Sequence, residues 1–218
     1  MAEPAAANLS LMWATPIVEV RNPNHAQTKP ALVNHCYELE RRAAAAVESG
    51  VTPMKKANLY ESKFDFFKAE APEVQALHNF CGEAMSRAVQ HLLQRNPQEP
   101  LPRQLGVDLF ESWVHVTHDG GYHEVHDHPN CSWCGIYYVE IGDCTMNPPN
   151  GVNRFFSPAM ILYEDFGSNA YRQTPVTVAP EEGKLVLFPS YVQHSAMLYR
   201  GGRDRIVVSF NSRLHARA

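Results

Sequence analysis

The sequence predicts an α+β fold that is mainly β: a double-stranded β-helix of the jelly-roll or cupin-like type, with N-terminal helices packed on it. Two observations predict this class. Before residue 100, apolar residues recur at helical spacing. After residue 100, short β-type segments lie between turn residues. We therefore expect residues 1–100 to form a helical N-terminal part and residues 101–218 the β-helix core, together one compact domain.

Two helices are expected in the N-terminal part, each with one apolar stripe that packs on the sheet. The first stripe consists of Leu32, Cys36, Leu39, Ala43 and Val47. Pro72 suits the first turn of the second helix. The second stripe consists of Val74, Leu77, Cys81, Met85, Ala88 and Leu92. Residues 55–69, between the helices, are expected to be irregular or partly extended.

Short strands are expected after residue 100. They cover residues 106–118, 134–142, 175–178, 184–188, 194–199 and 205–212. Glycine pairs at 120–121 and 201–202 mark two of the turns. Short strands with frequent turns are typical of a sandwich or barrel. The long segment 147–174 is expected to form a flap beside the functional site.

The composition argues against several classes of protein. The formal net charge of −4 and the lack of a basic tract argue against a nucleic-acid partner. No apolar run approaches the roughly 20 residues of a membrane span, and the first ten residues do not resemble a signal peptide. Five cysteines without an export signal predict reduced thiols and a cytoplasmic protein with no membrane partner.

Histidines provide the candidate metal ligands. Residues i and i+2 of a strand point to the same side, so His126 and His128 can present two imidazoles to one ion. Pro129 is expected to end that strand. His194 is the third candidate, 66 residues after His128, at the start of a later strand. This long gap requires antiparallel strands to bring the ligands together, and the spacing excludes a His-Glu-x-x-His helix.

Arg205 is the candidate anion-binding residue. By strand alternation it shares a face with Val207, Ser209 and Asn211. An arginine among apolar neighbours is costly to bury without a partner. The partner is either an internal acid, such as Glu111 or Asp127, or an anionic ligand, whose carboxylate a guanidinium binds in bidentate fashion.

These residues make the chain similar to the 2-oxoglutarate/Fe(II)-dependent oxygenase family of bacterial and phage proteins. The similarity is good from about Trp113 to Asn211 and weak before residue 100. It is carried by Thr15-Pro-Ile17, Trp113, Gly121-Tyr-His, His126-x-His128-Pro-Asn, Gly135-Ile-Tyr-Tyr138, Gly183-x-Leu-x-Leu-Phe-Pro-Ser190, His194 and Arg205-Ile-x-x-Ser-Phe-Asn211.

The resemblance implies that His126 is the first metal ligand, that His194 is the distal histidine, and that Arg205 binds the far carboxylate of 2-oxoglutarate. The wider superfamily carries Asp or Glu where this chain has His128. The chain therefore departs from the usual triad of two histidines and one carboxylate. We expect a three-histidine site, with Asp127 as a lower-ranked alternative to His128.

The predicted function is that of an Fe(II)- and 2-oxoglutarate-dependent oxygenase that hydroxylates a small-molecule or peptide substrate. The expected contacts with the cosubstrate are Arg205, Asn211 and Tyr137.

Two other functions are also considered. One is a three-histidine cupin-type dioxygenase that uses no 2-oxoglutarate, which the spacing from Gly183 to His194 supports. The other is a non-catalytic β-helix module that binds zinc. Cys131 and Cys134, together with His126 and His128, match a zinc-binding pattern, but such a site would leave His194 and Arg205 without a role.

Overall fold

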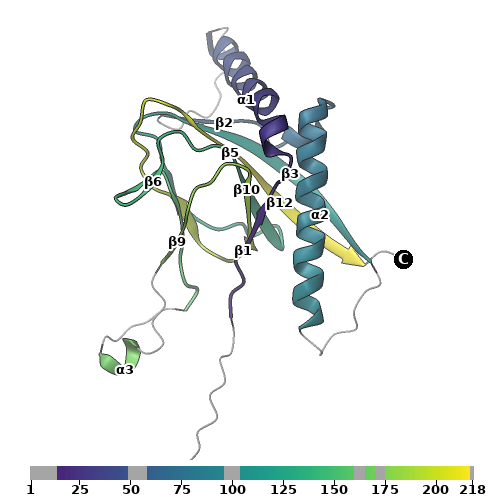
Figure 1. The fold of residues 1–218 in the computed structure, drawn as a ribbon, viewed down its shortest axis with the longest axis vertical. Helices are drawn as coiled ribbons and strands as arrows, with labels where there is room; N and C mark the ends of the chain where they lie inside the picture. The colour runs from purple at the N-terminus through teal and green to yellow at the C-terminus, as the bar shows by residue number, and fades with distance from the viewer. Residues whose placement is uncertain (1–13, 49–57, 96–103, 160–164, 170–174, 217–218) are drawn as a thin grey trace, which may run out of the picture.

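The structure is a computed structural model that describes residues 14–48, 58–95, 104–159, 165–169 and 175–216. Two antiparallel sheets lie face to face, and two long helices cover the outer face of the larger sheet (Figure 1). This arrangement confirms the predicted double-stranded β-helix.

The larger sheet has six strands in the order β1-β10-β5-β12-β3-β2. Their bounds are Val18–Arg21 (β1), Lys184–Pro189 (β10), Trp133–Glu140 (β5), Arg205–Ala216 (β12), Leu105–Thr117 (β3) and Leu59–Glu61 (β2). β12 lies inside the sheet and pairs with both β5 and β3. Its first eight residues are buried, because the helices cover one face and the smaller sheet the other.

The smaller sheet has four strands in the order β4-β11-β8-β9. Their bounds are His123–His126 (β4), His194–Ala196 (β11), Asn153–Phe155 (β8) and Val176–Val178 (β9). Two further short strands, Thr145–Met146 (β6) and Pro149–Asn150 (β7), pair with each other.

The expected flap at 147–174 is partly wrong, because β8 belongs to the smaller sheet. A short helix, α3 (Phe166–Asn169), lies further along this segment. Residues 160–164 and 170–174 of the segment lie outside the described residues.

Side chains divide between two apolar cores, because successive residues of a strand point to opposite faces. On β5, Tyr137 packs towards the helices, whereas Ile136 and Tyr138 point between the sheets. On β12, Val208 packs towards the helices and Val207 points between the sheets. The space between the sheets therefore receives every second residue of the central strands, and the functional site lies there.

Both expected helices are present, as α1 (His25–Glu48) and α2 (Pro72–Gln94). The first four residues of the predicted α2 stripe are confirmed, since Val74, Leu77, Cys81 and Met85 are at most 1% exposed. Further along the helix, Val89 and Leu93 rather than Leu92 belong to the core or pack against it. The described part of segment 55–69 contains β2 and a 3-10 helix, Phe66–Lys68. This short helix adds its two phenylalanines to the core beneath α2.

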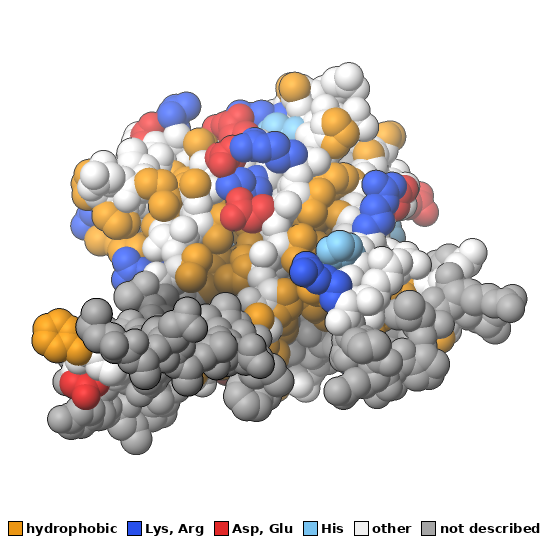
Figure 2. Space-filling model, turned by 60° about the horizontal axis from the view of Figure 1, so that its bottom comes forward, with side chains coloured by type: hydrophobic (Ala, Val, Ile, Leu, Met, Phe, Trp, Pro, Cys, Tyr) orange, Lys and Arg blue, Asp and Glu red, His pale blue; other side chains and the backbone are white. Residues whose placement is uncertain are grey.

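On the face shown in Figure 2, basic and acidic side chains are interspersed, and neither sign forms a continuous patch. Among the helices that the structure describes, none combines the length and apolar character needed to cross a membrane.

Candidate functional site

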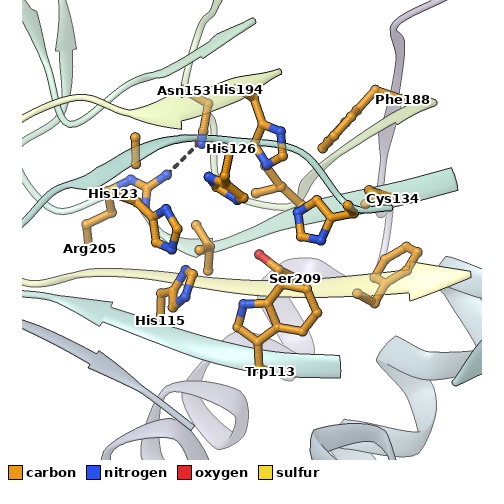
Figure 3. Close-up of a pocket in the computed structure, with 16 residues that line it drawn as sticks. Trp113, His115, His123, His126, Cys134, Asn153, Phe188, His194, Arg205 and Ser209 are labelled. Carbon is orange, nitrogen blue, oxygen red and sulfur yellow. Dashed lines mark hydrogen bonds between the residues drawn. The ribbon is translucent and has the colours of Figure 1, made fainter. Parts of the chain in front are cut away.

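Three imidazoles, those of His126, His128 and His194, line one cavity between the sheets, and Figure 3 labels the first and the last of them. His126 ends β4 and His194 begins β11, and the two are antiparallel partners with ring centroids 4.2 Å apart. The ring of His128 lies 5.1 Å from that of His126 and 5.2 Å from that of His194. One ligand atom from each ring lies within 4.8 Å of the other two. Three nitrogens this close can share one ion at bond lengths of about 2.0–2.1 Å.

The local structure at His128 differs from the expected one. His128 does not share a strand with His126, because β4 ends at His126. The backbone N–H of His128 instead donates to the carbonyl of Ser190 at 3.1 Å. Its ring stacks on Trp113, with 5.7 Å between centroids. A loop contact and an aromatic stack, rather than strand alternation, therefore orient this imidazole.

Backbone carbonyls orient the other two rings. Nδ1 of His126 lies 2.8 Å from the carbonyl oxygen of Glu124, and Nδ1 of His194 lies 3.1 Å from that of Val192. A carbonyl oxygen only accepts, so these contacts favour the tautomer in which Nδ1 carries the proton and Nε2 keeps its lone pair. Metal-binding histidines commonly use the second nitrogen in this way.

Burial favours the neutral form of His128 and His194. Burial, together with the nearby His126, lowers the pKa of His194 to about 3 and that of His128 to about 4. Neutral imidazole is the form that binds metals. Asp127, the alternative ligand, is exposed and is not among the three converging groups.

Arg205 lies in the same cavity, and it is only 2% exposed. Its Nη2 donates to Oδ1 of Asn153 at 2.6 Å, and its guanidinium lies over the ring of Tyr138, 5.6 Å from the centroid. Its Nε has no hydrogen-bond partner in the part of the chain that the structure describes. Figure 3 shows the guanidinium of Arg205 in the same pocket as the imidazoles of His126 and His194.

No ion pair between described residues includes Arg205. Glu111, one of the two acids considered for it, accepts instead from Nδ2 of Asn211 at 2.8 Å. A buried guanidinium without a carboxylate is costly. Of the two partners that the sequence left open, the geometry therefore favours an anionic ligand.

Part of the chain matches the model of a known family. Residues 111–211 match the model of a family described as "Putative 2OG-Fe(II) oxygenase". This part of the chain is a 2OG-Fe(II) oxygenase domain. The enzyme is an oxidoreductase that uses Fe(II) and 2-oxoglutarate, which confirms the predicted oxygenase class, cofactor and cosubstrate. Hydroxylation and the kind of substrate stay predictions. No curated protein matches the sequence.

Solved structures share the fold of this oxygenase. A prolyl-4-hydroxylase from Pseudomonas putida has a TM-score of 0.54 at 16% identity, over 91% of this chain and 93% of that one. A prolyl 4-hydroxylase from Phytophthora capsici has a TM-score of 0.51 at 18% identity, over 90% and 58%. The alpha ketoglutarate dependent epimerase SnoN from nogalamycin biosynthesis has a TM-score of 0.57 at 12% identity, over 91% and 77%. These similarities support the fold.

The expected contact between Tyr137 and the cosubstrate is wrong. Tyr137 points to the helix side of β5, where its hydroxyl lies 3.0 Å from Nδ2 of Asn22 and 2.8 Å from Nδ1 of His25. Strand alternation instead turns Tyr138 inwards, where its hydroxyl lies 2.7 Å from Oδ1 of Asn153. The Gly-Ile-Tyr-Tyr motif could not by itself assign the two tyrosines to their faces.

Asn211 lies at the outer edge of the oxygenase site, far along β12 from Arg205. It lines an outer cavity together with His126 and His128. Besides its bond to Glu111, its Oδ1 lies 3.5 Å from Sγ of Cys134. Its contact with the cosubstrate stays a prediction.

Sequence reasoning missed Asn153 and Glu61. Asn153 comes from the segment interpreted as a flap. Glu61 lies on β2 opposite His115, and Oε2 of Glu61 is 2.7 Å from Nε2 of His115. His123 joins this pair, so these three residues form a second cluster beside the first.

The cysteine-based zinc site receives no support. The sulfur atoms of Cys131 and Cys134 lie 3.5 Å apart, and Cys134 contacts the side chain of Asn211. Neither of the two potential metal-binding groups among the described residues contains a cysteine. His126 and His128 are instead grouped with His194.

Proposed function

We propose that His126, His128 and His194 hold the Fe(II) of this oxygenase and that Arg205 binds the far carboxylate of 2-oxoglutarate. In this proposal a peptide or a small molecule is hydroxylated. The observation that carries it is the buried guanidinium of Arg205, which faces the same cavity as the three imidazoles and lacks a carboxylate partner among the described residues.

The side chains around Arg205 fit a dicarboxylate. Asn153 and Tyr138 hold the guanidinium on one side, and its Nε remains available as a donor. A bidentate carboxylate would use this donor and compensate the buried charge. Asn153 is itself oriented by the hydroxyl of Tyr138, so these three residues would act as one unit.

Bound Fe(II), with 2-oxoglutarate as cosubstrate, supplies the activation of dioxygen for the oxidation. The chain's own residues position the reactants. The three imidazoles would hold the ion through their unprotonated nitrogens. The aromatic wall formed by Trp113, Phe188 and Phe155 excludes water from the centre, because all three side chains are at most 5% exposed.

The substrate would enter from the outer cavity. This cavity has a volume of about 280 Å³ and is lined by His126, His128, Trp113 and Phe64, among others. The inner cavity at Arg205 is far smaller, about 30 Å³. Phe64 is 51% exposed, which suits contact with a partner molecule. The Pseudomonas putida structure of the same fold is a prolyl-4-hydroxylase, which favours a peptide as the first class to test.

We also propose a cytoplasmic location. The five cysteines are free thiols in the structure, and reduced thiols together with Fe(II) suit a reducing compartment. Cell fractionation tests this, and recovery from an exported fraction would contradict it.

The test of the site is equilibrium binding of 2-oxoglutarate to Mn(II)-loaded protein, followed by succinate production with Fe(II). Arg205→Ala removes a charged bidentate contact worth about 3 kcal/mol, so the Kd for 2-oxoglutarate should rise roughly 100-fold. Arg87→Ala is the matched control, because Arg87 is an exposed arginine of α2 paired with Glu83. Equal affinity of the Arg205→Ala variant and wild type would remove Arg205 from the site.

A further inference from the structure

A second cluster of metal-ligand type lies next to the proposed iron site. Glu61, His115 and His123 come from three different strands, β2, β3 and β4. One ligand atom from each lies within 4.8 Å of the other two. Their side chains are only 13%, 12% and 17% exposed, so these are not loose surface groups.

The strand pairing explains the convergence. Glu61 and His115 are opposite each other in the antiparallel β2–β3 pair, and directly opposed side chains share a face. His123 begins β4 in the other sheet and brings its ring to 5.3 Å from that of His115. Both sheets therefore contribute to this cluster, whereas the strand residues of the three-histidine group, His126 and His194, come from the smaller sheet alone.

The atomic separations suit coordination. Oε2 of Glu61 lies 2.7 Å from Nε2 of His115 and 3.8 Å from Nε2 of His123. For an ion about 2.1 Å from each atom, these separations correspond to ligand–metal–ligand angles of roughly 80° and 130°. Both angles occur in four- and five-coordinate sites. Two imidazoles and one carboxylate form a donor set that first-row divalent metals favour.

We propose that Glu61, His115 and His123 bind a second divalent transition-metal ion, adjacent to the iron site but independent of its ligands. The carboxylate gives this cluster a negative charge that the three-histidine group lacks, and that charge favours a dication. His123 and Glu61 also line the outer cavity, so the ion lies on the side from which we propose that the substrate enters.

The two ions should bind in sequence. The rings of His123 and His126 are 4.2 Å apart, so two dications at these positions repel each other. Occupancy of one site therefore weakens the other, and removing either site should strengthen binding at the one that remains.

The test is anaerobic titration of metal-free full-length protein with Co(II), followed by calorimetry and by the visible absorption of bound Co(II). Wild type should bind two equivalents in two steps. Glu61→Gln, which preserves size, and His115→Gln should each bind one equivalent. His194→Ala should also bind one equivalent, and the Glu61→Gln/His194→Ala double variant should bind none. Glu83→Gln, on the exposed surface of α2, is the matched control and should bind two equivalents.

The outcomes separate this inference from the proposed function. A wild-type stoichiometry of one that Glu61→Gln and His115→Gln leave unchanged overturns the second site, and the Glu61–His115 contact is then a structural hydrogen bond. A stoichiometry that His194→Ala leaves unchanged contradicts the proposed iron site, while loss of one equivalent in Glu61→Gln still supports the second site. Circular dichroism of each variant checks that the fold is retained.

Discussion

His194 lies directly opposite His126 in the antiparallel pair of β11 and β4, and their ring centroids are 4.2 Å apart. This cross-strand pairing brings together two histidines that are 68 residues apart in the chain. His128 completes the group from beyond the end of β4. The proposed metal site thus depends on one strand pair and one loop, and each can be tested separately.

The identity of the third ligand can be tested at residues 127 and 128. His128→Ala should reduce Fe(II) affinity by roughly 10- to 100-fold or more, and His128→Asp should retain Fe(II) because it restores two histidines and one carboxylate. Asp127→Ala should bind Fe(II) like wild type, because Asp127 is exposed and outside the group. Iron content after anaerobic loading is the measurement. Loss of iron in Asp127→Ala with retention in His128→Ala would reverse the assignment.

Substitution of the two adjacent tyrosines should have different effects: one should weaken 2-oxoglutarate binding and the other should lower the stability of the fold. Tyr138→Phe removes the hydroxyl that contacts Asn153, the partner of Arg205, so the Kd for 2-oxoglutarate should rise by roughly 5- to 10-fold. Tyr137→Phe removes contacts with Asn22 and His25 on the helix side and should lower the melting temperature without changing that Kd. An equal loss of affinity in both variants would contradict the assignment of the tyrosines to opposite faces.

Position 135, where β5 pairs with β12, has no room for a side chain. Gly135 lies opposite Phe210, and a Cβ added at Gly135 would overlap the Phe210 ring. Gly135→Ala should therefore destabilise the fold by about 1–3 kcal/mol, through overpacking of a buried contact. Denaturant unfolding measures this change.

A matched glycine provides the control for this substitution. Gly82 lies within α2, and a Cβ there meets no atom within 4 Å. Gly82→Ala should stabilise the helix by about 0.5–1 kcal/mol. Adding Phe210→Leu to Gly135→Ala should restore part of the lost stability. If Gly135→Ala and Gly82→Ala shift the unfolding midpoint alike, the close packing at Gly135 is not what constrains that position.

His118 should make stability depend on pH. Its Nε2 lies 2.7 Å from Glu40 of α1, and its Nδ1 lies 2.7 Å from Asp204, before β12. Burial opposes the charged form, but the hydrogen bonds to the two carboxylates outweigh it and raise the pKa of His118. The stabilisation is therefore fully present below about pH 6.5 and is lost as the pH rises through the raised pKa.

Melting temperatures measured from pH 6 to pH 9 test this link between α1 and the ends of β3 and β12. Wild type should lose stability as the pH rises, and His118→Gln should show a flatter profile. His91→Gln, at an exposed position of α2, is the control and should follow wild type. Parallel profiles for wild type and His118→Gln would exclude His118 as the source.

Much of the site could be predicted from local sequence. Alternation along β12 correctly placed Arg205 and Val207 on one face, because side chains of a strand follow a period of two, and the structure shows that this is the inner face. The apolar stripe of α2 could also be predicted from the sequence, because one face of the helix is buried against the sheet. The same reasoning did not assign the inner face of β5, since both Tyr137 and Tyr138 are apolar enough for either core.

By itself, the sequence determined the fold class, the two helices and the choice of three histidines as candidate metal ligands. These follow from periodicity and from residue types with few alternative roles. Only the tertiary structure decided that Tyr138 rather than Tyr137 faces Arg205, that Asn153 supports the guanidinium, and that Glu61 meets His115 and His123. These contacts join segments far apart in the chain. Strand register fixes them, and register depends on the packing of whole sheets rather than on any local pattern.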